Sequence, residues 1–285
     1  TTTFTQADIN NKAIAFQQDD TSTEPSFTIT VTDPDGGETS AEAIVNFTSV
    51  NDTPTANDDS GEGFTTNEDT AFTTPDLTLN DTDEEGTPLT VSQVNGGVAT
   101  LASGATVTIN GNSVDYDPNG QFEDLAVGES VTDTFEYTLS DNDPMGAETD
   151  TATVTIVIEG ANDAPTAVAD VETTSENTTK VLDVLANDTD PDTSDQLTIL
   201  SVDTTNVLGQ VTNNGTTLTY NPTAAPGSLK DGETRTEIFS YVVSDGNGGT
   251  ATASVTVTVT GVNDDPTAVD DAGAGFATDD NQALP

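Results

Sequence analysis

The sequence contains no cysteine, no histidine and no tryptophan, and only 4 of its 285 residues are lysine or arginine. Without cysteine, the chain can form neither disulfides nor thiolate metal sites, which often hold small extracellular domains together. Without histidine or cysteine, the Ser-His-Asp, Cys-His and zinc-hydrolase arrangements are impossible. We therefore expect no enzymatic activity, and we expect some other cross-link to stabilise the fold.

Basic residues are so few that the 51 aspartates and glutamates give a formal charge of −47. Such a chain repels nucleic acid and anionic membrane surfaces, so neither is expected as a partner. High charge can also indicate disorder. However, Thr151–Ile158 and Ser254–Thr260 alternate small polar with β-branched apolar residues, a pattern typical of half-buried strands. We expect an all-β fold, provided that something neutralises the carboxylates.

The length of 285 residues suits two or three domains of about 100–150 residues each. The sequence begins at Thr1 without an initiator methionine, and no apolar run approaches the ~20 residues that a membrane-spanning helix needs. We interpret it as an internal part of a longer protein, with no membrane span in this stretch.

A junction motif with the pattern Asn-Asp-x-Pro-Thr-Ala occurs three times, at Val50–Ala56, Ala161–Ala167 and Val262–Ala268. Its first asparagines, Asn51, Asn162 and Asn263, are 111 and 101 residues apart. Each interval is the size of one β-sandwich domain. The repeat therefore predicts complete modules at residues 51–161 and 162–262, the C-terminal part of a module at 1–50, and the start of another at 263–285.

A second motif precedes each junction, at Phe27–Asp33, Phe135–Asp141 and Phe239–Asp245. Each copy runs into a turn rich in Asp and Gly and then into an alternating strand, which predicts the last hairpin of each module. A third motif, at Leu77–Asp83 and Val184–Asp190, reads as an apolar strand that ends in clustered Asn and Asp.

In an antiparallel sandwich of seven strands, the entering linker, the loop after the second strand and the final hairpin turn lie at the same end. Three acidic segments should therefore meet at each interdomain joint. Like charges at that density are costly unless a cation lies among them, and oxygen ligands without histidine or cysteine favour Ca²⁺. The candidate ligands are Asn51, Asp52, Asn80, Asp81, Asp83, Asp141, Asp143, Asn162, Asp163, Asn187, Asp188, Asp190, Asp192, Asp245, Asn247, Asn263 and Asp264.

Calcium drawn from two neighbouring modules would replace a flexible linker with a stiff joint. For any single residue the alternative stays open, because Asn, Asp and Gly also occupy ordinary solvated turns. The loop from Asp188 is not an EF-hand, since its sixth and twelfth positions are Thr193 and Ile199 instead of Gly and Glu.

The junction, the Asn-Asp-Thr-Asp loop and the Phe-x-Tyr strand together resemble the cadherin-like and Ig-like repeats of bacterial adhesins. These include the VCBS and RapA2-type extender modules of large proteins exported by type I secretion. The likeness covers residues 51–271, and residues 1–50 resemble the end of a cadherin-like repeat of the chondroitin-sulfate-proteoglycan type. Two departures are the turn at 141–146, which lacks an Asp-Gly step, and Asp58, which stands where the second module has Ala169.

The resemblance implies tandem β-sandwiches in an elongated rod with calcium at the joints. The function expected is that of a stiff spacer in a secreted or cell-surface adhesin that supports cell attachment or biofilm formation. Contacts with other surface proteins or glycans are expected from domains outside this stretch. Two alternatives remain: a carbohydrate- or surface-binding module, which predicts exposed aromatic residues gathered on one face, and an accessory region of an extracellular enzyme.

Overall fold

The computed structural model describes residues 26–44, 50–144, 146–225 and 228–266, and the chain divides into two compact units at the Ala161–Asn162 step. Before the first complete module, β1 (Ser26–Thr32) and β2 (Glu38–Ile44) form an antiparallel hairpin around a turn in which Asp33 Oδ1 accepts from the N–H groups of Asp35 and Gly37. The predicted partial modules at 1–50 and 263–285 lie for the most part outside the described residues.

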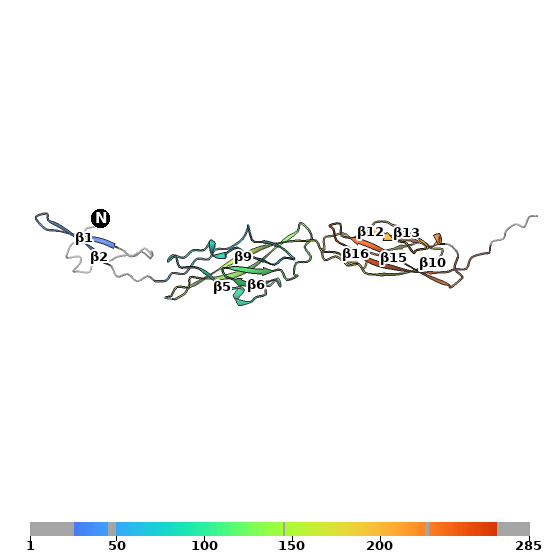
Figure 1. Cartoon of the computed structure of the whole chain (residues 1–285), viewed down its shortest axis with the longest axis horizontal. Coiled ribbons are helices and arrows are strands. Elements are labelled where there is room, and N and C mark those ends of the chain that lie inside the picture. The colour runs from blue at the N-terminus through green and yellow to red at the C-terminus, as the bar shows by residue number, and fades with distance from the viewer. Residues whose placement is uncertain (1–25, 45–49, 145, 226–227, 267–285) are drawn as a thin grey trace, which may run out of the picture. The chain divides into compact units, whose positions relative to one another are not determined.

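The first module contains seven strands in two sheets (Figure 1). One sheet has the order β3-β9-β8-β5 and the other β4-β7-β6, with β3 parallel to β9 and the other pairs antiparallel. The strands are β3 (Thr65–Asn67), β4 (Phe72–Thr73), β5 (Thr90–Val94), β6 (Thr106–Asn110), β7 (Ser113–Asp117), β8 (Ser130–Ser140) and β9 (Thr149–Glu159).

The second module repeats this topology, with sheet orders β10-β16-β15-β12 and β11-β14-β13 and with β10 parallel to β16. Its strands are β10 (Asp170–Ser175), β11 (Lys180–Leu182), β12 (Thr198–Asp203), β13 (Gln210–Asn213), β14 (Leu218–Asn221), β15 (Thr234–Ser244) and β16 (Thr250–Thr260). The predicted all-β sandwich class is confirmed in both units.

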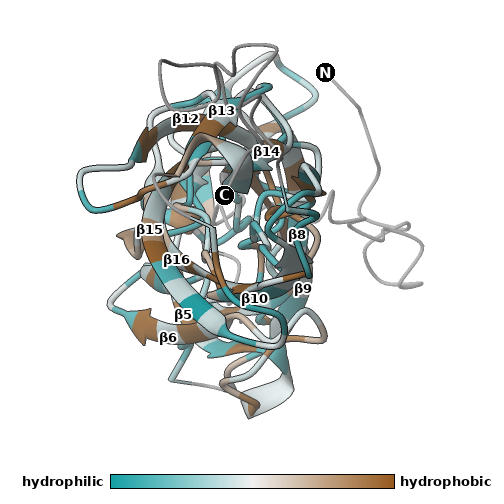
Figure 2. Ribbon diagram, turned by 90° about the vertical axis from the view of Figure 1, so that its right-hand side faces the viewer, coloured by the Kyte–Doolittle hydropathy of each residue, from teal (hydrophilic) through white to brown (hydrophobic). Residues whose placement is uncertain are grey.

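The long final hairpins, β8–β9 and β15–β16, supply much of each core. Along β9, Val154, Ile156 and Ile158 are fully buried, while the alternating threonines face outward. Figure 2 shows hydrophobic and hydrophilic bands alternating along β15 and β16. Period-2 patterning of this kind places every second side chain in the core, as the sequence predicted for these segments.

Two equivalent tyrosines, Tyr137 on β8 and Tyr241 on β15, are fully buried at the centre of the two cores. A buried phenol needs a hydrogen-bond partner, and both hydroxyls find theirs among acidic and carbonyl oxygens, as described below. Burying a ring of this size stabilises a module by about 2–3 kcal/mol through the hydrophobic effect.

The strand predicted at Leu77–Leu79 is wrong, because these residues form a 3₁₀ turn, η1 (Leu77–Leu79). Asp76 Oδ1 accepts hydrogen bonds from the Thr78 N–H (2.9 Å) and hydroxyl (2.7 Å) and so caps the turn. In the second module the matching stretch follows β11 as a turn. The other 3₁₀ turns are η2 (Asn95–Gly97) and η3 (Pro222–Ala224), and across the described ranges no helix is long and apolar enough to cross a membrane.

Candidate metal centres

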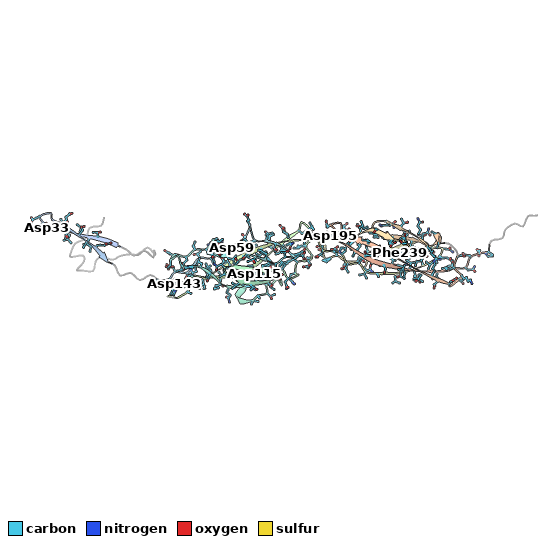
Figure 3. The ribbon with its side chains drawn as sticks, in the orientation of Figure 1. Asp33, Asp59, Asp115, Asp143, Asp195 and Phe239 are labelled. Atoms are coloured by element: carbon cyan, nitrogen blue, oxygen red, sulfur yellow. The ribbon has the colours of Figure 1, made fainter. Side chains whose placement is uncertain are left out.

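The linker and the final hairpin turn of the first module are joined by a direct side-chain contact. Asn51 Nδ2 donates to Asp141 Oδ2 (2.6 Å) and to the Gly146 carbonyl (3.0 Å). Asp141 is almost fully buried, and its Oδ1 accepts from the N–H groups of Asp143 (3.1 Å) and Glu148 (3.0 Å). Asn142 supports this turn with a left-handed backbone (φ 54°), a conformation that asparagine adopts more readily than most residues. Figure 3 shows Asp143 at one end of the module.

The acidic loop after η1 reaches the same linker. Thr55 and Thr82 form an antiparallel bridge, and the Asp52 N–H donates to Glu85 Oε2 (3.3 Å). Asp83 Oδ1 accepts from the Thr87 N–H and hydroxyl, while its Oδ2 is buried without a hydrogen-bond partner. The three segments predicted to converge within this module are therefore adjacent.

The second module has the same connections. Asn162 Nδ2 donates to Asp245 Oδ2 (3.1 Å), the Asp163 N–H donates to Asp192 Oδ2 (2.9 Å), and Thr166 bridges to Thr189. Its hairpin turn is tighter, because Asp245 Oδ1 accepts from three successive N–H groups, those of residues 247, 248 and 249, at 2.7–3.1 Å. The linker, the acidic loop and the turn thus form one frame in each module.

Three carboxylates gather at this end of the second module. One carboxylate oxygen from each of Asp190, Asp195 and Asp245 lies within 4.8 Å of those from the other two. Asn247 Nδ2 donates to both oxygens of Asp195 (2.9 and 2.8 Å), and Asp192 N–H donates to Asp190 Oδ1 (3.0 Å). Figure 3 places Asp195 at the end of the module.

Several oxygens at this end are buried and have no hydrogen-bond partner: Asn162 Oδ1, Asp163 Oδ2, Asp190 Oδ2 and Asp192 Oδ1. Leaving such atoms unpaired is costly. An oxygen-binding cation would satisfy them, and carboxylate and amide oxygens are the donors that Ca²⁺ takes. The residues present therefore fit a calcium ion, with Asn162, Asp190, Asp192, Asp195 and Asp245 as the residues that would hold it.

The carboxylates of the cluster have pKa values shifted in opposite directions, according to how many hydrogen bonds each accepts. Burial raises the pKa of Asp190 and of Asp192, and neighbouring aspartates raise it further. Burial also acts to raise the pKa of Asp245, but hydrogen bonds from Asn162 and from the turn N–H groups outweigh it and hold that pKa below its ordinary value. The same balance, with Asn51 as donor, lowers the pKa of Asp141. Asp141 and Asp245 are thus fixed anions around which a cation can bind.

Four of the predicted ligands, Asn80, Asp81, Asn187 and Asp188, contact the segment that follows the linker and not the hairpin turn. Asn80 Nδ2 donates to the Asn57 and Asp58 carbonyls, and Asn187 Nδ2 donates to the Val168 carbonyl. Asp81 accepts from the Asn57 N–H (2.8 Å) and the Tyr137 hydroxyl. Asp188 likewise accepts from the Val168 N–H and from Tyr241. These four side chains bind the segment after the linker instead of the hairpin turn.

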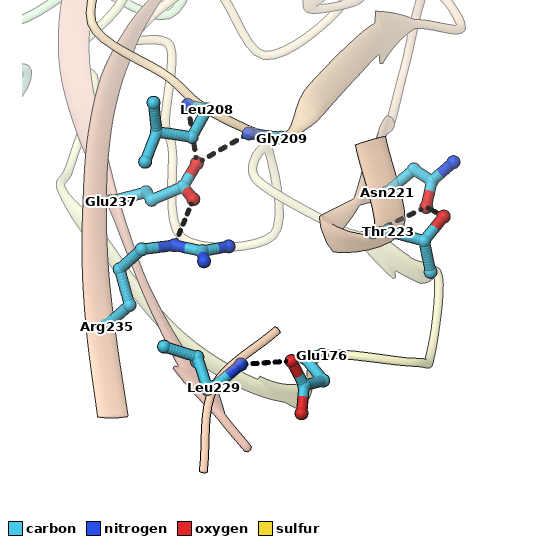
Figure 4. A network of polar contacts seen from close by, with 8 residues as sticks. All are labelled: Glu176, Leu208, Gly209, Asn221, Thr223, Leu229, Arg235 and Glu237. Carbon is cyan, nitrogen blue, oxygen red and sulfur yellow. Dashed lines mark hydrogen bonds and ion pairs between the residues drawn. The ribbon is translucent and has the colours of Figure 1, made fainter. Parts of the chain in front are cut away.

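Sequence reasoning missed two kinds of acidic residue. Glu85 and Asp195 belong to the acidic loops described above. Glu68 and Glu176 are buried, and each accepts a hydrogen bond from an N–H two residues beyond its module's last strand: Ala161 N to Glu68 Oε1 (2.8 Å) and Val262 N to Glu176 Oε1 (2.9 Å). Figure 4 shows the second oxygen of Glu176 accepting from Leu229 N (2.7 Å).

A signal for the two glutamates was present, because both end a Thr-Thr-x-Glu pattern early in their modules, in Thr65–Glu68 and Thr173–Glu176. The last predicted pair, Asn263 and Asp264, is exposed, and the segment expected to complete its site falls outside the described residues.

Comparison with known families assigns both modules. Residues 51–160 match the bacterial cadherin-like domain family, and residues 162–258 match the bacterial Ig domain family. Taken with the two seven-stranded sandwiches, these matches show that residues 51–160 form a bacterial cadherin-like repeat and residues 162–258 a bacterial Ig-like repeat. No curated protein matches the sequence.

Solved cadherin structures align with the chain. Extracellular cadherin domains 1–3 of the mouse clustered protocadherin PcdhgC3 align with 20% identity over 85% of this chain and 78% of that chain, with a TM-score of 0.50. Domains 22–24 of mouse cadherin-23 align with 15% identity over 82% of this chain and 73% of that one, with a TM-score of 0.48. At this level of identity the first of these likenesses indicates the fold and nothing finer.

Proposed function

We propose that residues 51–262 are two calcium-stiffened spacer modules of a large secreted or cell-surface bacterial adhesin. The partial modules at 1–50 and 263–285 continue the same series, and each Asn-Asp junction is a calcium joint. The modules carry no catalytic role and hold an adhesive domain, encoded elsewhere, away from the cell. This adhesin would support attachment or biofilm formation after export by type I secretion.

The observation that carries this proposal is the cluster of Asp190, Asp195 and Asp245, in which one carboxylate oxygen from each residue lies within 4.8 Å of the other two. The chain has 51 acidic and 4 basic residues, so protein cations cannot neutralise such clusters. Two carboxylates 4 Å apart repel each other by about 4 kcal/mol at an effective dielectric of 20. A divalent ion converts that repulsion into attraction and binds the linker to the loop and the turn.

Calcium is favoured over other ions by the donor set. Zinc and copper prefer sites with His or Cys, and the chain has neither. Magnesium requires near-ideal octahedral geometry at short distances, whereas calcium accepts six to eight oxygens in irregular arrangements. Mixed carboxylate, amide and carbonyl oxygens on three separate segments suit the larger, more tolerant ion.

The aromatic residues do not support the carbohydrate-binding alternative. Among the residues that the structure describes, every Phe and Tyr side chain with an assigned exposure is buried or half-buried. A stacking surface for sugars would need several of them exposed on one face.

Calorimetric melting of the whole chain in calcium, in magnesium and in chelator tests the proposal. We expect a large upward shift of the melting temperature that is specific to calcium, since an ion that binds only the folded state stabilises it. Identical melts in all three solutions would show that the acidic clusters are ordinary turns and would overturn the proposal.

A further inference from the structure

Inside each module, away from the hairpin cluster, a buried tyrosine hydroxyl lies among oxygen acceptors. Tyr137 Oη is 3.0 and 2.9 Å from the two carboxylate oxygens of Asp81, 3.2 Å from the Asn57 carbonyl and 3.4 Å from the Leu77 carbonyl. A phenol has one hydrogen to donate. One donor thus faces four acceptor atoms in a fully buried position.

The second module repeats the arrangement atom for atom. Tyr241 Oη is 3.1 and 2.9 Å from the oxygens of Asp188, 2.9 Å from the Val184 carbonyl and 3.4 Å from the Val168 carbonyl. The two modules therefore build the same oxygen-rich pocket from the same segments.

A second carboxylate completes each pocket. Asp59 is only 8% exposed, its Oδ2 is buried without a hydrogen-bond partner, and its main chain is fixed to β9 by bonds to Thr153 and Thr155 (both 2.9 Å). In the second module Asp170, at the start of β10, also has a buried Oδ2 without a partner.

The two carboxylates of a pocket interact strongly. Burial and the charge of Asp81 raise the pKa of Asp59 to about 6, and burial and the charge of Asp188 do the same for Asp170, in each case against a hydrogen bond from the tyrosine. Each pocket therefore contains two acidic groups and one hydroxyl hydrogen; Asp59 is buried, and Asp81, Asp170 and Asp188 are half-buried. Such an excess of oxygen over hydrogen indicates a missing positive charge.

We propose that each module holds an internal hard-cation site, formed by Asp59, Asp81, Tyr137 and two main-chain carbonyls in the first module, and by Asp170, Asp188, Tyr241 and their matching carbonyls in the second. The site is separate from the hairpin cluster, since Figure 3 shows Asp59 farther along the module than Asp143, which lies at its end. Two carboxylates, two carbonyls and a hydroxyl supply the oxygen-only donor set that Ca²⁺ takes.

An internal site has a different consequence from one at a joint. It ties the segment after the linker, through Asp59 and the Asn57 carbonyl, to the loop at Asp81 and to the core strand that carries Tyr137. It therefore stabilises one module by itself, with no contribution from a neighbour.

Equilibrium dialysis of the whole chain against radioactive calcium, at neutral pH, counts the ions. Asp59→Asn and Asp170→Asn preserve side-chain shape and should each bind one ion fewer than the unmodified chain, with the double variant two fewer. Asp115→Asn, which removes the same charge from an exposed position on β7, is the matched control and should bind as many ions as the unmodified chain. If the folded double variant bound as many calcium ions as the unmodified chain, the proposal would be overturned, and the positive charge in each pocket would be that of a proton.

Terbium luminescence tests the unmodified chain and so does not depend on any variant folding. Tyrosine transfers excitation energy to Tb³⁺ bound close to it, and the chain has no Trp to compete. We expect strong tyrosine-excited emission that persists in Asp141→Asn/Asp245→Asn, where only the hairpin clusters are weakened. Absent emission, or emission abolished by the hairpin variants, would contradict an internal site. If the hairpin clusters bound no ion, this emission would remain, so the test distinguishes the internal site from the proposed function, on which it does not depend.

Discussion

The two modules share one main-chain frame and differ in the side chains placed on it. In both, an Asn of the linker binds a buried Asp of the hairpin turn: Asn51 with Asp141, and Asn162 with Asp245. The second turn is glycine-rich, with Gly246 and Gly248 at φ 93° and 122°, and offers Asp245 three N–H donors. Among the described residues of the first turn, two N–H groups bind Asp141.

The acidic loops differ as well. Between Glu85 and β5 the first module has no acidic residue, whereas the second has Asp195 between Asp192 and β12. In both modules the backbone brings the same three segments together, while loop length and the turn sequence set how many carboxylates reach them. We therefore expect tighter calcium binding at the start of the second module than at the start of the first.

The largest effect is expected from the hairpin aspartates. Asp245→Asn should destabilise the second module in calcium by about 2–4 kcal/mol, because it removes a charged acceptor of three N–H groups together with an ion ligand. Asp141→Asn should cost less in the first module. Chemical denaturation in calcium and in chelator measures both, and equal losses in the two modules would contradict the difference drawn above.

The next largest effect is expected from Asp59→Asn, whose effect on stability should change sign with calcium. In chelator the ionised Asp59 should destabilise the fold by up to about 3 kcal/mol at pH 7, because burial and the charge of Asp81 raise its pKa to about 6. Asp59→Asn should then be more stable than the unmodified chain. Because the folded pKa lies above the unfolded value of 3.8, this gain is full above about pH 6 and is lost as the pH falls toward 3.8.

In saturating calcium the order should reverse, with Asp59→Asn the less stable protein. Denaturation midpoints of Asp59→Asn and of the unmodified chain, measured at pH 7 and pH 4 with and without calcium, check both the gain in chelator and the loss in calcium. A variant that is less stable in chelator as well would mean that Asp59 serves only through its hydrogen bonds.

A smaller effect is expected on the calcium affinity of one module alone. Asp195→Asn should weaken calcium binding in the second module roughly tenfold, equivalent to about 1.4 kcal/mol, and should leave the first module unchanged. Titration calorimetry of this variant beside Asp115→Asn resolves it. If the weakening appeared at both modules, the binding events would be coupled and could not be assigned to separate loops.

The smallest effect is expected at the opposite end of the module. Hydrogen bonds from Leu229 and Val262 lower the pKa of Glu176, so its stabilising contribution is present above the ordinary value of 4.5 and is lost as the pH falls below it. Glu176→Gln should lower the melting temperature slightly at pH 7, and this loss should shrink as the pH falls through the lowered pKa of the folded chain. A larger drop in melting temperature in acid than at pH 7 would contradict this pH dependence.

Sequence patterns predicted the strands best where burial alternates strictly. The hairpins β8–β9 and β15–β16 follow directly from the Phe-x-Tyr motif and the alternating threonines. Leu77–Leu79 was misassigned because three apolar or β-branched residues look like a strand, while the Asp76 cap that turns them into a 3₁₀ helix is a local hydrogen bond that periodicity does not reveal.

The site was only partly predictable for a similar reason. Repeat spacing brings the linker, loop and hairpin to one end, but it does not say which way a carboxylate in an irregular loop points. The Asp81 N–H bonds to Thr78 O, and the Asp188 N–H to Leu185 O, so both residues close turns and face their tyrosines, while Asp83 and Asp190, two residues on, belong to the end clusters. The module boundaries and the ligand assignments stay predictions.

Small-angle X-ray scattering of the whole chain, in calcium and in chelator at equal ionic strength, tests the stiff-spacer proposal most directly. We predict that calcium yields the scattering of a stiff, extended particle, and that chelator yields the broader distribution of distances expected of folded modules on flexible linkers. Magnesium at the same concentration should resemble chelator. Scattering curves that superimpose in calcium and in chelator, with both modules folded, would contradict the proposal.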